Sequence, residues 1–360
     1  MFFKNNKSKK KVFVAMSGGV DSSVAALLLK KKGYQVYGGF ILGYNLDGCQ
    51  DRDAEDARLV AEKLDIPFYV FDMEEEYKKR VVNYLLEGYK KGITPNPDVV
   101  CNSQIKFGLF YDKAMELGAN YVASGHYVRR KRKLSTGVFA AKDSNKDQSY
   151  FLWQVEKDRF DKLLFPLGKL RKEKVRKIAK KADLLTADKK DSQGVCFLGK
   201  FKFDEFLKEY IKPKTGDIID TQGEKVGTHD GVWFYTIGQK HGFINTAGKE
   251  FYVIGKDFNK NQLLVAYEGD EKLYCNEFEA VSLNFLDDKT KIDFENKKEI
   301  KILVRTRYRQ PLFEVNLHQH KSVKSALISV NSQIKIFPAS GQSAVFYKKN
   351  GQMLGGGIII

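Results

Sequence analysis

The chain has 360 residues, of which 42% are hydrophobic and 13% aromatic, so it can form two or three domains that each bury a core. Lysine and arginine outnumber aspartate and glutamate by 62 to 45, and the net charge of +17 fits a polyanionic partner as well as a merely solvated basic surface. The apolar runs are too short to cross a bilayer and the N-terminus lacks the apolar core of a signal peptide, which argues against a membrane partner and predicts a cytoplasmic protein.

The first third of the chain alternates between segments typical of buried strands and segments with the apolar spacing of helices. This βαβαβ pattern predicts an α/β fold, a doubly wound parallel sheet with helices on both faces and with ligands at the carboxyl ends of its strands. The predicted strands are 12–16, 35–42, 68–71 and 121–124, and the predicted helices are 23–29, 53–64, 75–91 and 103–117.

Two further segments of this part carry information about function. Thr94–Asp98 contains two prolines, which disfavour a helix and predict an extended loop. Phe160–Ala182 is predicted to be a helical stretch rich in lysine and arginine. Contacts with a phosphate backbone and a solvated helix face are equally good interpretations of its charge.

After Tyr210 the helical periodicity gives way to short β-like runs, and we expect a linker near 208–214. Trp233–Gln239 is predicted to be a strand that ends in a turn. From Tyr274 onward, further runs predict the strands of a small barrel or sandwich. The predicted domains are an α/β domain over 1–210, a central β-rich domain over 211–273 and a C-terminal β-barrel over 274–360.

The turn Ser17–Ser22 joins the first predicted strand to the first predicted helix. Its two glycines let the backbone approach an anion, and the N–H groups and dipole at the helix start favour negative charge. It is not a Walker A loop, because no Gly-Lys-Ser/Thr follows, and it lacks the third glycine of GxGxxG. Its sequence SGGVDS resembles the PP-loop of ATP pyrophosphatases, which cleave ATP between the α- and β-phosphates. An ordinary glycine-rich turn is the alternative.

The four cysteines form neither a CxxC pair nor a dense disulfide framework, which indicates a reducing compartment. Cys101 follows Asn96–Asp98 at the start of a predicted helix, a position that lowers a thiol pKa. Cys196 lies in a polar, glycine-flanked loop, so both residues suit reactive thiols. From composition alone, two unrelated buried cysteines are the better interpretation. Cys49 and Cys275 are interpreted as structural or incidental.

Eight ordered motifs, spread almost from end to end, resemble those of the bacterial tRNA-specific 2-thiouridylases, which replace the C2 oxygen of the wobble uridine (position 34) with sulfur. The resemblance implies a PP-loop domain of the adenine nucleotide alpha hydrolase type, a small β-rich domain and a β-barrel. The motifs are AMSGGVDSSV, GITPNPDVVCNSQIKFG, ASGHY, KDQSYFL, DSQGVCFLG, HDGVWFYTIGQKHG, VRTRYRQ and PASGQSAVFY.

The resemblance also implies which residues form the site. The family usually has Gly at the position of Ala15 and Met at the position of Ile41, and Asn96–Asp98 match the loop that meets the target base. The ATP-binding residues implied are Ala15, Met16, Ser17, Gly18, Gly19, Val20, Asp21, Ser22, Ile41 and Gly125. The tRNA-binding residues implied are Asn96, Pro97, Asp98, Lys146, Asp147, Gln148, Arg307 and Tyr308. The catalytic residues implied are Cys101, Cys196 and Asp98, and no set of metal ligands is implied.

The chemistry implied by the resemblance begins with ATP, which adenylates the uridine C2 oxygen and releases pyrophosphate, with Mg²⁺ neutralising phosphate charge. Cys196 would carry a persulfide, and Cys101 would attack it or resolve it as a transient disulfide. Asp98 would shuttle a proton at a base flipped out of the anticodon stack. The partners implied are tRNA of the Lys, Glu and Gln isoacceptors and a cysteine desulfurase or sulfur-relay protein as donor. Affinity for tRNA is expected to fall steeply with salt.

Two other classes of function compete. Another PP-loop enzyme, such as a ligase or amidotransferase that adenylates a small molecule or lysidinylates tRNA, would not need Cys101 and Cys196 and would survive thiol alkylation. A non-catalytic nucleotide- or RNA-binding protein would release no pyrophosphate in the presence of tRNA.

Overall fold

The computed structural model describes residues 10–45, 48–131, 137–191, 202–240, 244–245, 250–330 and 337–360. The chain divides into two compact units. Unit 1 comprises Met1–Lys78 and Val100–Lys200, and unit 2 comprises Lys79–Val99 and Phe201–Ile360. The segment that precedes Cys101 therefore belongs with the C-terminal half of the chain.

Unit 1 is built on a parallel sheet with helices on both faces. Its strands are β1 (Lys11–Ala15), β2 (Gln35–Leu42), β3 (Phe68–Asp72), β4 (Tyr121–Ser124), β5 (Val128–Lys131), β6 (Gly137–Ala140) and β7 (Leu163–Leu164). Its helices are α1 (Val20–Lys31), α2 (Cys49–Lys63), α3 (Glu74–Tyr77), α6 (Phe110–Glu116) and α7 (Lys172–Lys181), with the π-helix η2 (Cys101–Leu109) and the 3₁₀ helices η3 (Ser149–Leu152) and η4 (Lys157–Lys162).

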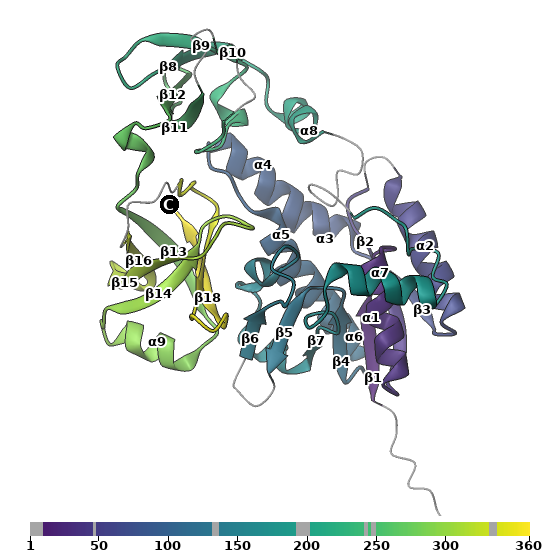
Figure 1. The fold of residues 1–360 in the computed structure, drawn as a ribbon. Helices are drawn as coiled ribbons and strands as arrows, with labels where there is room; N and C mark the ends of the chain where they lie inside the picture. The colour runs from purple at the N-terminus through teal and green to yellow at the C-terminus, as the bar shows by residue number, and fades with distance from the viewer. Residues whose placement is uncertain are drawn as a thin grey trace, which may run out of the picture. The chain divides into compact units, whose positions relative to one another are not determined.

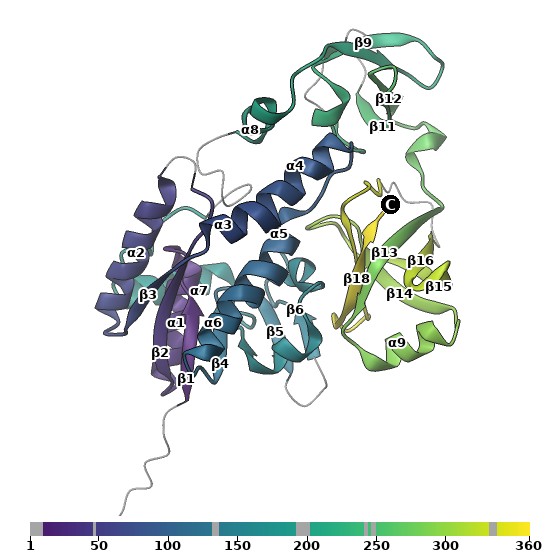
Figure 2. The same ribbon diagram turned by 180° about the vertical axis from the view of Figure 1, so that it is seen from behind.

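The sheet has the order β3-β2-β1-β4-β7, and all of its pairings are parallel. Apolar residues of α1, α2 and α7 form one core with β1 on one face of the sheet. On the other face, Phe110 of α6 packs its ring against Phe71 of β3, with centroids 5.1 Å apart (Figures 1 and 2). The predicted doubly wound parallel sheet is confirmed.

Unit 2 contains the helix α4 and two all-β parts. Its helices are α4 (Asn83–Lys90), α8 (Phe203–Tyr210) and α9 (Asp288–Glu295), with the 3₁₀ helices η5 (Val232–Phe234) and η6 (Glu271–Leu273). Its strands are β8 (Gly216–Ile219), β9 (Lys225–His229), β10 (Ile244–Asn245), β11 (Phe251–Asp257), β12 (Gln262–Tyr267), β13 (Glu277–Phe285), β14 (Ile300–Arg305), β15 (Phe313–His320), β16 (Ser322–Val330), β17 (Ser343–Tyr347) and β18 (Met353–Ile359). The π-helix η1 (Lys78–Val82) and the helix α5 (Pro97–Val100) each cross from one unit to the other.

The two β parts of unit 2 have separate cores. The central sheet has the order β10-β9-β8-β12-β11, and the C-terminal strands close into the barrel β13-β16-β15-β14-β17-β18. Phe294 of α9 is fully buried in the barrel core and packs against Phe285 with ring centroids 5.1 Å apart. The structure confirms the predicted β-rich part and chooses the barrel over the sandwich.

The predicted strand over Trp233–Gln239 is wrong. Val232–Phe234 form a 3₁₀ helix instead, because Asn261 Oδ1 accepts a hydrogen bond from Val232 N–H at 3.3 Å and the Val232 side chain is fully buried. These tertiary contacts override the β propensity of the aromatic run.

The predicted helix over Phe160–Ala182 is also wrong in its first half. The chain passes from η4 through β7 into a loop, and α7 begins only at Lys172. Pro166 interrupts any helix there, and a Cβ on Gly168 would collide with the carbonyl group of Val128.

The loop prediction for Thr94–Asp98 holds only as far as Asn96. Pro97 begins helix α5, at the first helical position that suits proline, and Asn96 Oδ1 accepts a hydrogen bond from Val99 N–H at 3.3 Å. Asp98 is therefore helical. Strand β18 was not predicted, because its three successive glycines are unusual in a strand.

Candidate active site

The loop after β1 has the geometry of an anion-binding turn. Gly18 has φ +66°, and a Cβ there would collide with the carbonyl oxygen of Asp53. Ser22 Oγ accepts a hydrogen bond from Ser17 N–H at 3.1 Å and donates one to Gly19 O at 3.1 Å. The helical bond from Ser23 N–H to Gly19 O leaves the preceding N–H groups of the first turn without an intrahelical acceptor. The loop thus fits a phosphate group.

Of the other two predicted ATP-binding positions, Ile41 lies on a strand next to this loop and Gly125 directly follows one. Ala15 of β1 is opposite Gly39 of β2 and Ser124 of β4, so β1 and β4 end side by side while β2 continues to Leu42. Ile41 lies near the carboxyl end of β2, and Gly125 follows β4 directly. A Cβ on Gly125 would lie 2.7 Å from Ser22 N, so the chain passes close against the start of α1.

Asp21, in the first turn of α1, has two partners that sequence reasoning missed. Tyr127 OH donates to its Oδ1 at 2.7 Å, and Lys172 Nζ donates to its Oδ2 at 2.7 Å. Burial and the nearby Asp21 carboxylate raise the pKa of Tyr127, so its hydroxyl stays a donor. Lys172 also pairs with Asp191 Oδ1 at 2.7 Å. Lys172 therefore links Asp21, at the start of α1, to the carboxylate of Asp191.

Asp191 forms ion pairs with three cationic side chains. Its partners are Lys146 at 2.6 Å, Lys172 at 2.7 Å and Arg176 at 2.8 Å. Partial burial alone would raise its pKa, but hydrogen bonds and charge from Lys146 and Lys172 hold that pKa at about 2. Cys196 and the rest of 192–201 lie outside the described residues. Asp191, the last described residue before this segment, is thus an ionised carboxylate held in place by its ion pairs.

The predicted tRNA-binding residues Lys146, Asp147 and Gln148 have partners within unit 1. Asp147 is only 3% exposed, and its oxygens accept hydrogen bonds from Ala141 N–H and from Ser149. Gln148 Oε1 accepts from Tyr127 N–H at 3.0 Å. These contacts give Asp147 and Gln148 a structural role next to the loop, and their contact with RNA stays a prediction.

Cys101 begins the π-helix η2 and is 8% exposed. A π-helix is a wide, uncommon turn that is often found at functional sites. Within η2, Gly108 has the non-helical angles φ −103° and ψ −105°. The pairing of Cys101 with Cys196 stays a prediction.

The loop before the predicted base-contacting residues is fastened by unit 2. Thr94 N–H donates to Ser340 O at 2.8 Å, Gln342 Nε2 donates to Thr94 O at 2.8 Å, and the Thr94 and Thr236 hydroxyls lie 3.2 Å apart. Lys256 Nζ donates to Gly92 O at 2.7 Å. The barrel and the central sheet therefore both hold the loop that leads to Asn96.

Arg307 and Tyr308 follow β14 in a turn of unit 2. The backbone N–H of Arg307 donates to Gln310 Oε1 at 3.1 Å, and its guanidinium donates to Ile237 O and lies over the Phe337 ring at 5.7 Å. The Arg309 guanidinium lies over the ring of Tyr308 at 5.2 Å. Their predicted contact with tRNA is not tested by this geometry.

Sequence reasoning missed Tyr127, Lys172, Thr94 and Lys256 as parts of the site. Tyr127 closes the motif ASGHY, which is a signal that could have pointed to it. Lys172 could not be told from its basic neighbours, because only the fold shows which lysine of α7 faces Asp21. Thr94 is bonded to Ser340 and Gln342, and Lys256 is bonded to Gly92, so both residues depend on partners distant in sequence that no local pattern reveals.

The described residues hold neither a cluster of metal ligands nor a membrane-spanning helix. Within the described ranges, no cluster of three or more His, Cys, Asp or Glu side chains could hold a metal ion. Among those same residues, no helix combines the length and the apolar character needed to span a membrane.

A nucleotide-binding type of α/β fold followed by two β domains defines the general class of the protein. Three family models match the chain in that order. They are described as the tRNA methyl transferase HUP domain over residues 10–200, the tRNA methyl transferase PRC-barrel domain over 204–267 and the aminomethyltransferase beta-barrel domain over 275–359.

Curated relatives define the family more narrowly. A tRNA-specific 2-thiouridylase MnmA of Listeria monocytogenes is 42% identical and covers 98% of this chain and 95% of its own length. A protein of the same name from Bacillus licheniformis is 42% identical, with 97% and 94% covered. The chain belongs to the tRNA-specific 2-thiouridylase family, a family of tRNA-modifying enzymes.

Among solved structures, a 4-thiouridine synthetase in complex with RNA and ATP is similar to part of the chain. It is 19% identical, with a TM-score of 0.36, over 53% of this chain and 46% of that one. A likeness of this size supports no conclusion about function.

Proposed function

We propose that this protein uses ATP and Mg²⁺ to convert the wobble uridine of tRNA to 2-thiouridine, with AMP and pyrophosphate as the other products. The observation that carries the proposal is the 42% identity to tRNA-specific 2-thiouridylases over 98% of the chain. The anion-binding turn after β1 supports it independently, because adenylation requires a site for the phosphates of ATP.

In the first step, the C2 oxygen of uridine attacks the α-phosphorus of ATP. The bond between the α-phosphorus and the bridging oxygen to the β-phosphate breaks, and pyrophosphate leaves with that electron pair. The first-turn N–H groups of α1 are suited to hold the phosphates, and Gly125 leaves room beside them. Mg²⁺ would be held mainly by phosphate oxygens with one or two carboxylates, a mode that does not require a preformed cluster.

In the second step, the terminal sulfur of a persulfide on Cys196 attacks C2, and AMP leaves with the former uridine oxygen. The thiolate of Cys101 then attacks the Cys196 sulfur, which breaks the S–S bond and leaves the other sulfur on C2. The resulting disulfide between Cys101 and Cys196 needs a dithiol reductant before the next cycle. Asp98 is the carboxylate proposed to move a proton at the base.

The proposal assigns the remaining partners by the same chemistry. A cysteine desulfurase or sulfur-relay protein supplies the persulfide, the Lys, Glu and Gln isoacceptors are the tRNAs, and the reaction takes place in the cytoplasm. The tRNA would be positioned by the predicted contacts, which are those of Asn96–Asp98, Lys146–Gln148, Arg307 and Tyr308.

The direct test is to incubate the protein with ATP, Mg²⁺, a persulfide donor, a dithiol reductant and unmodified tRNA, and to identify the nucleosides by mass spectrometry. We expect 2-thiouridine and one pyrophosphate for each thiolated tRNA. A methylated nucleoside formed from a methyl donor, or pyrophosphate release without tRNA, would overturn the proposal.

Cys101→Ser and Cys196→Ser test the sulfur step. Each variant should abolish sulfur transfer from a persulfide donor while tRNA affinity and tRNA-dependent pyrophosphate release remain, because adenylation precedes the use of sulfur. Cys275→Ser is the control, since that thiol donates to Glu277 O in unit 2 and has no assigned role. Full thiolation by either variant would rule out the two-thiol mechanism.

A further inference from the structure

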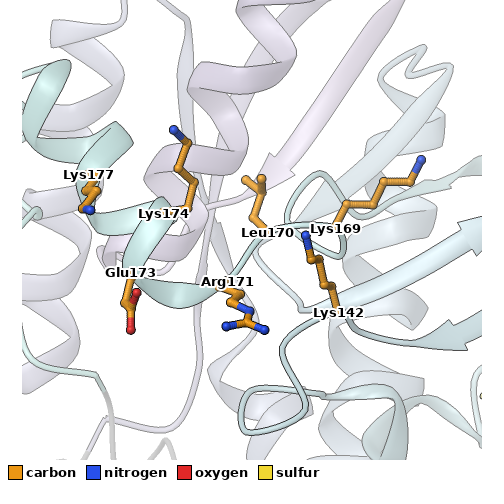
Figure 3. Close-up of a pocket in the computed structure, with 7 residues that line it drawn as sticks. All are labelled: Lys142, Lys169, Leu170, Arg171, Glu173, Lys174 and Lys177. Atoms are coloured by element: carbon orange, nitrogen blue, oxygen red, sulfur yellow. The ribbon is translucent and has the colours of Figure 1, made fainter.

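A cationic pocket of about 310 Å³ lies beside the first half of α7 in unit 1 (Figure 3). Five of its seven lining residues are cations, and Glu173 is the single carboxylate among them. Figure 3 shows Lys174 and Lys177 on the helix, with the other cations on the loops beside it. The lining residues are Lys142, Lys169, Leu170, Arg171, Glu173, Lys174 and Lys177.

The helix presents two differently charged faces. On one face Lys172, Arg176 and Lys180 each pair with a carboxylate, at 2.7 to 2.8 Å. On the pocket face Lys174 and Lys177 are exposed, and within the described ranges neither has an ion-pair partner. The pocket therefore keeps an excess of positive charge within the described part of the chain, with five cations against the single carboxylate of Glu173.

The walls of the pocket are fixed even though the cationic tips are long and exposed. Lys142 N–H donates to Gly168 O at 2.9 Å, which joins the loop after β6 to the loop before α7. Lys172 N–H donates to Asp143 Oδ2 at 2.9 Å, which holds the start of α7 to the same loop. The fold thus keeps the stems of these side chains in place while their ammonium groups can adjust to a ligand.

A second pocket of the same volume shares Lys169 with the first. It adds the cations Lys32, Arg129 and Arg130, of which Arg130 is paired with Asp161 at 2.6 Å. The positive surface therefore extends over more than one cluster, as contacts with several phosphates along a strand would require.

The lining identifies the class of ligand. Lysine binds phosphate as a point charge and arginine as a fork, whereas Leu170 is the single apolar residue and no aromatic ring offers a platform for a base. A small organic anion would favour a more enclosed and more apolar site. Phosphates of a polyanionic backbone fit an open surface on which five of the seven lining residues are cations.

We propose that the α7 pocket binds the phosphate backbone of the tRNA substrate and thereby sets how the tRNA is seated, without reading its sequence. The inference rests on the proposed function for the identity of the RNA. Phosphate contacts fix register and orientation, while base contacts specify. The pocket would add to the contacts predicted for Lys146–Gln148 and for Arg307 and Tyr308.

The test compares two triple variants of the full chain by the binding of fluorescently labelled, unmodified tRNA at several salt concentrations. The pocket variant is Lys142→Gln, Lys174→Gln and Lys177→Gln. The control variant makes the same charge change at the exposed residues Lys31, Lys113 and Lys162, none of which lines either pocket.

We expect the pocket variant to bind tRNA about tenfold more weakly near physiological salt and to lose about two to three units of salt slope. The control variant should change affinity by less than about threefold. Replacing the three pocket lysines with arginine should keep the affinity, because the charge remains. Binding of ATP should be equal in all variants, which shows that unit 1 is folded.

Two results would overturn the inference. One is an equal loss of affinity in the pocket and control variants. The other is wild-type tRNA affinity in the pocket variant together with loss of sulfur transfer from a protein donor but not from inorganic sulfide, which would assign the pocket to that donor. Wild-type protein that binds tRNA through the pocket yet forms no 2-thiouridine would instead refute the proposed function and leave the inference intact.

Discussion

The loop after β1 in unit 1 and the Thr94 loop in unit 2 are held in opposite ways. Asp21 at the first loop is tied to Lys172, which is tied in turn to Asp191, so ion pairs fix its surroundings. Thr94 is held through its backbone N–H and C=O and through a neutral hydroxyl contact. The loop proposed to receive phosphates thus has surroundings fixed by charge, whereas the loop proposed to approach a base is positioned mainly by neutral hydrogen bonds.

Lys256 is the exception in unit 2. It donates to Gly92 O at 2.7 Å and to Tyr235 O at 2.8 Å, and burial lowers its pKa to about 8. The lysine serves as a donor to two carbonyl groups. It strengthens the neutral hydrogen-bonded clamp rather than adding an ion pair.

The largest effect should come from Gly18→Ala. The new Cβ would collide with Asp53 O, and alanine disfavours φ +66°, so we expect a loss of roughly 3 kcal/mol in the free energy of unfolding and no pyrophosphate release. Thermal unfolding and a pyrophosphate assay measure both. Gly19→Ala is the control, because φ is −99° there and the nearest atom, Ser17 Oγ, lies 3.6 Å from the new Cβ. Similar losses of stability in both variants would contradict the role of the Gly18 conformation.

The next effect tests the ion pairs of unit 1. Lys172→Met leaves Asp21 without its cation beside the predicted phosphate site, and the uncompensated charge should lower the rate of pyrophosphate release at low ATP by about 10- to 100-fold. Lys180→Met is the control, since its pair with Asp188 is largely exposed and should contribute less than about 1 kcal/mol. An unchanged KM for ATP in Lys172→Met would show that the ion pairs of Lys172 do not contribute to nucleotide binding.

A smaller effect tests the clamp of unit 2. Gln342→Leu removes the donor to Thr94 O, at a cost of about 1 kcal/mol, and should lower kcat/KM for tRNA roughly fivefold with no change in KM for ATP. Gln352→Leu removes a comparable amide bond to Asp287 elsewhere in the barrel. The same kcat/KM for tRNA in the two variants would show that the hydrogen bonds to Thr94 have no special role in the use of tRNA.

The last effect concerns stability alone, as a dependence on pH with no expected change in activity. Because the folded pKa of Asp191 is about 2, below its ordinary 3.8, its ion pairs stabilise the fold above pH 3.8 and lose that contribution as the pH falls through about 2. Asp191→Asn should therefore lower the free energy of unfolding by at most about 2 kcal/mol near neutral pH. Urea unfolding over a pH series should show this difference vanish in acid. A difference that is constant over the series would mean that the carboxylate charge is not its cause.

Much of unit 1 was predictable because its strands form apolar runs, and the central strands β1 and β4 are buried along almost their whole length. The strand over 35–42 and the turn after β1 were found at their true positions for that reason. The 3₁₀ helix at Val232 was not predictable, because the hydrogen bond from Val232 N–H to Asn261 Oδ1 and the burial of Val232 decide it rather than local propensity. The partners of Asp21 come from positions 127 and 172, so only the folded chain can reveal them.

The path of the chain between the two units has a consequence for attempts to take the protein apart. Lys79–Val99 leaves unit 1, packs in unit 2 and returns at Val100, although one family model spans 10–200 without a break. A fragment that ends at residue 200 would keep this insert but remove Ser340 and Gln342 from Thr94, and would strip Phe203 from the ring of Tyr89. Neither a fragment that ends at residue 200 nor the remaining C-terminal fragment contains a complete unit. An exchange of the β domains between relatives therefore has to include the 79–99 insert.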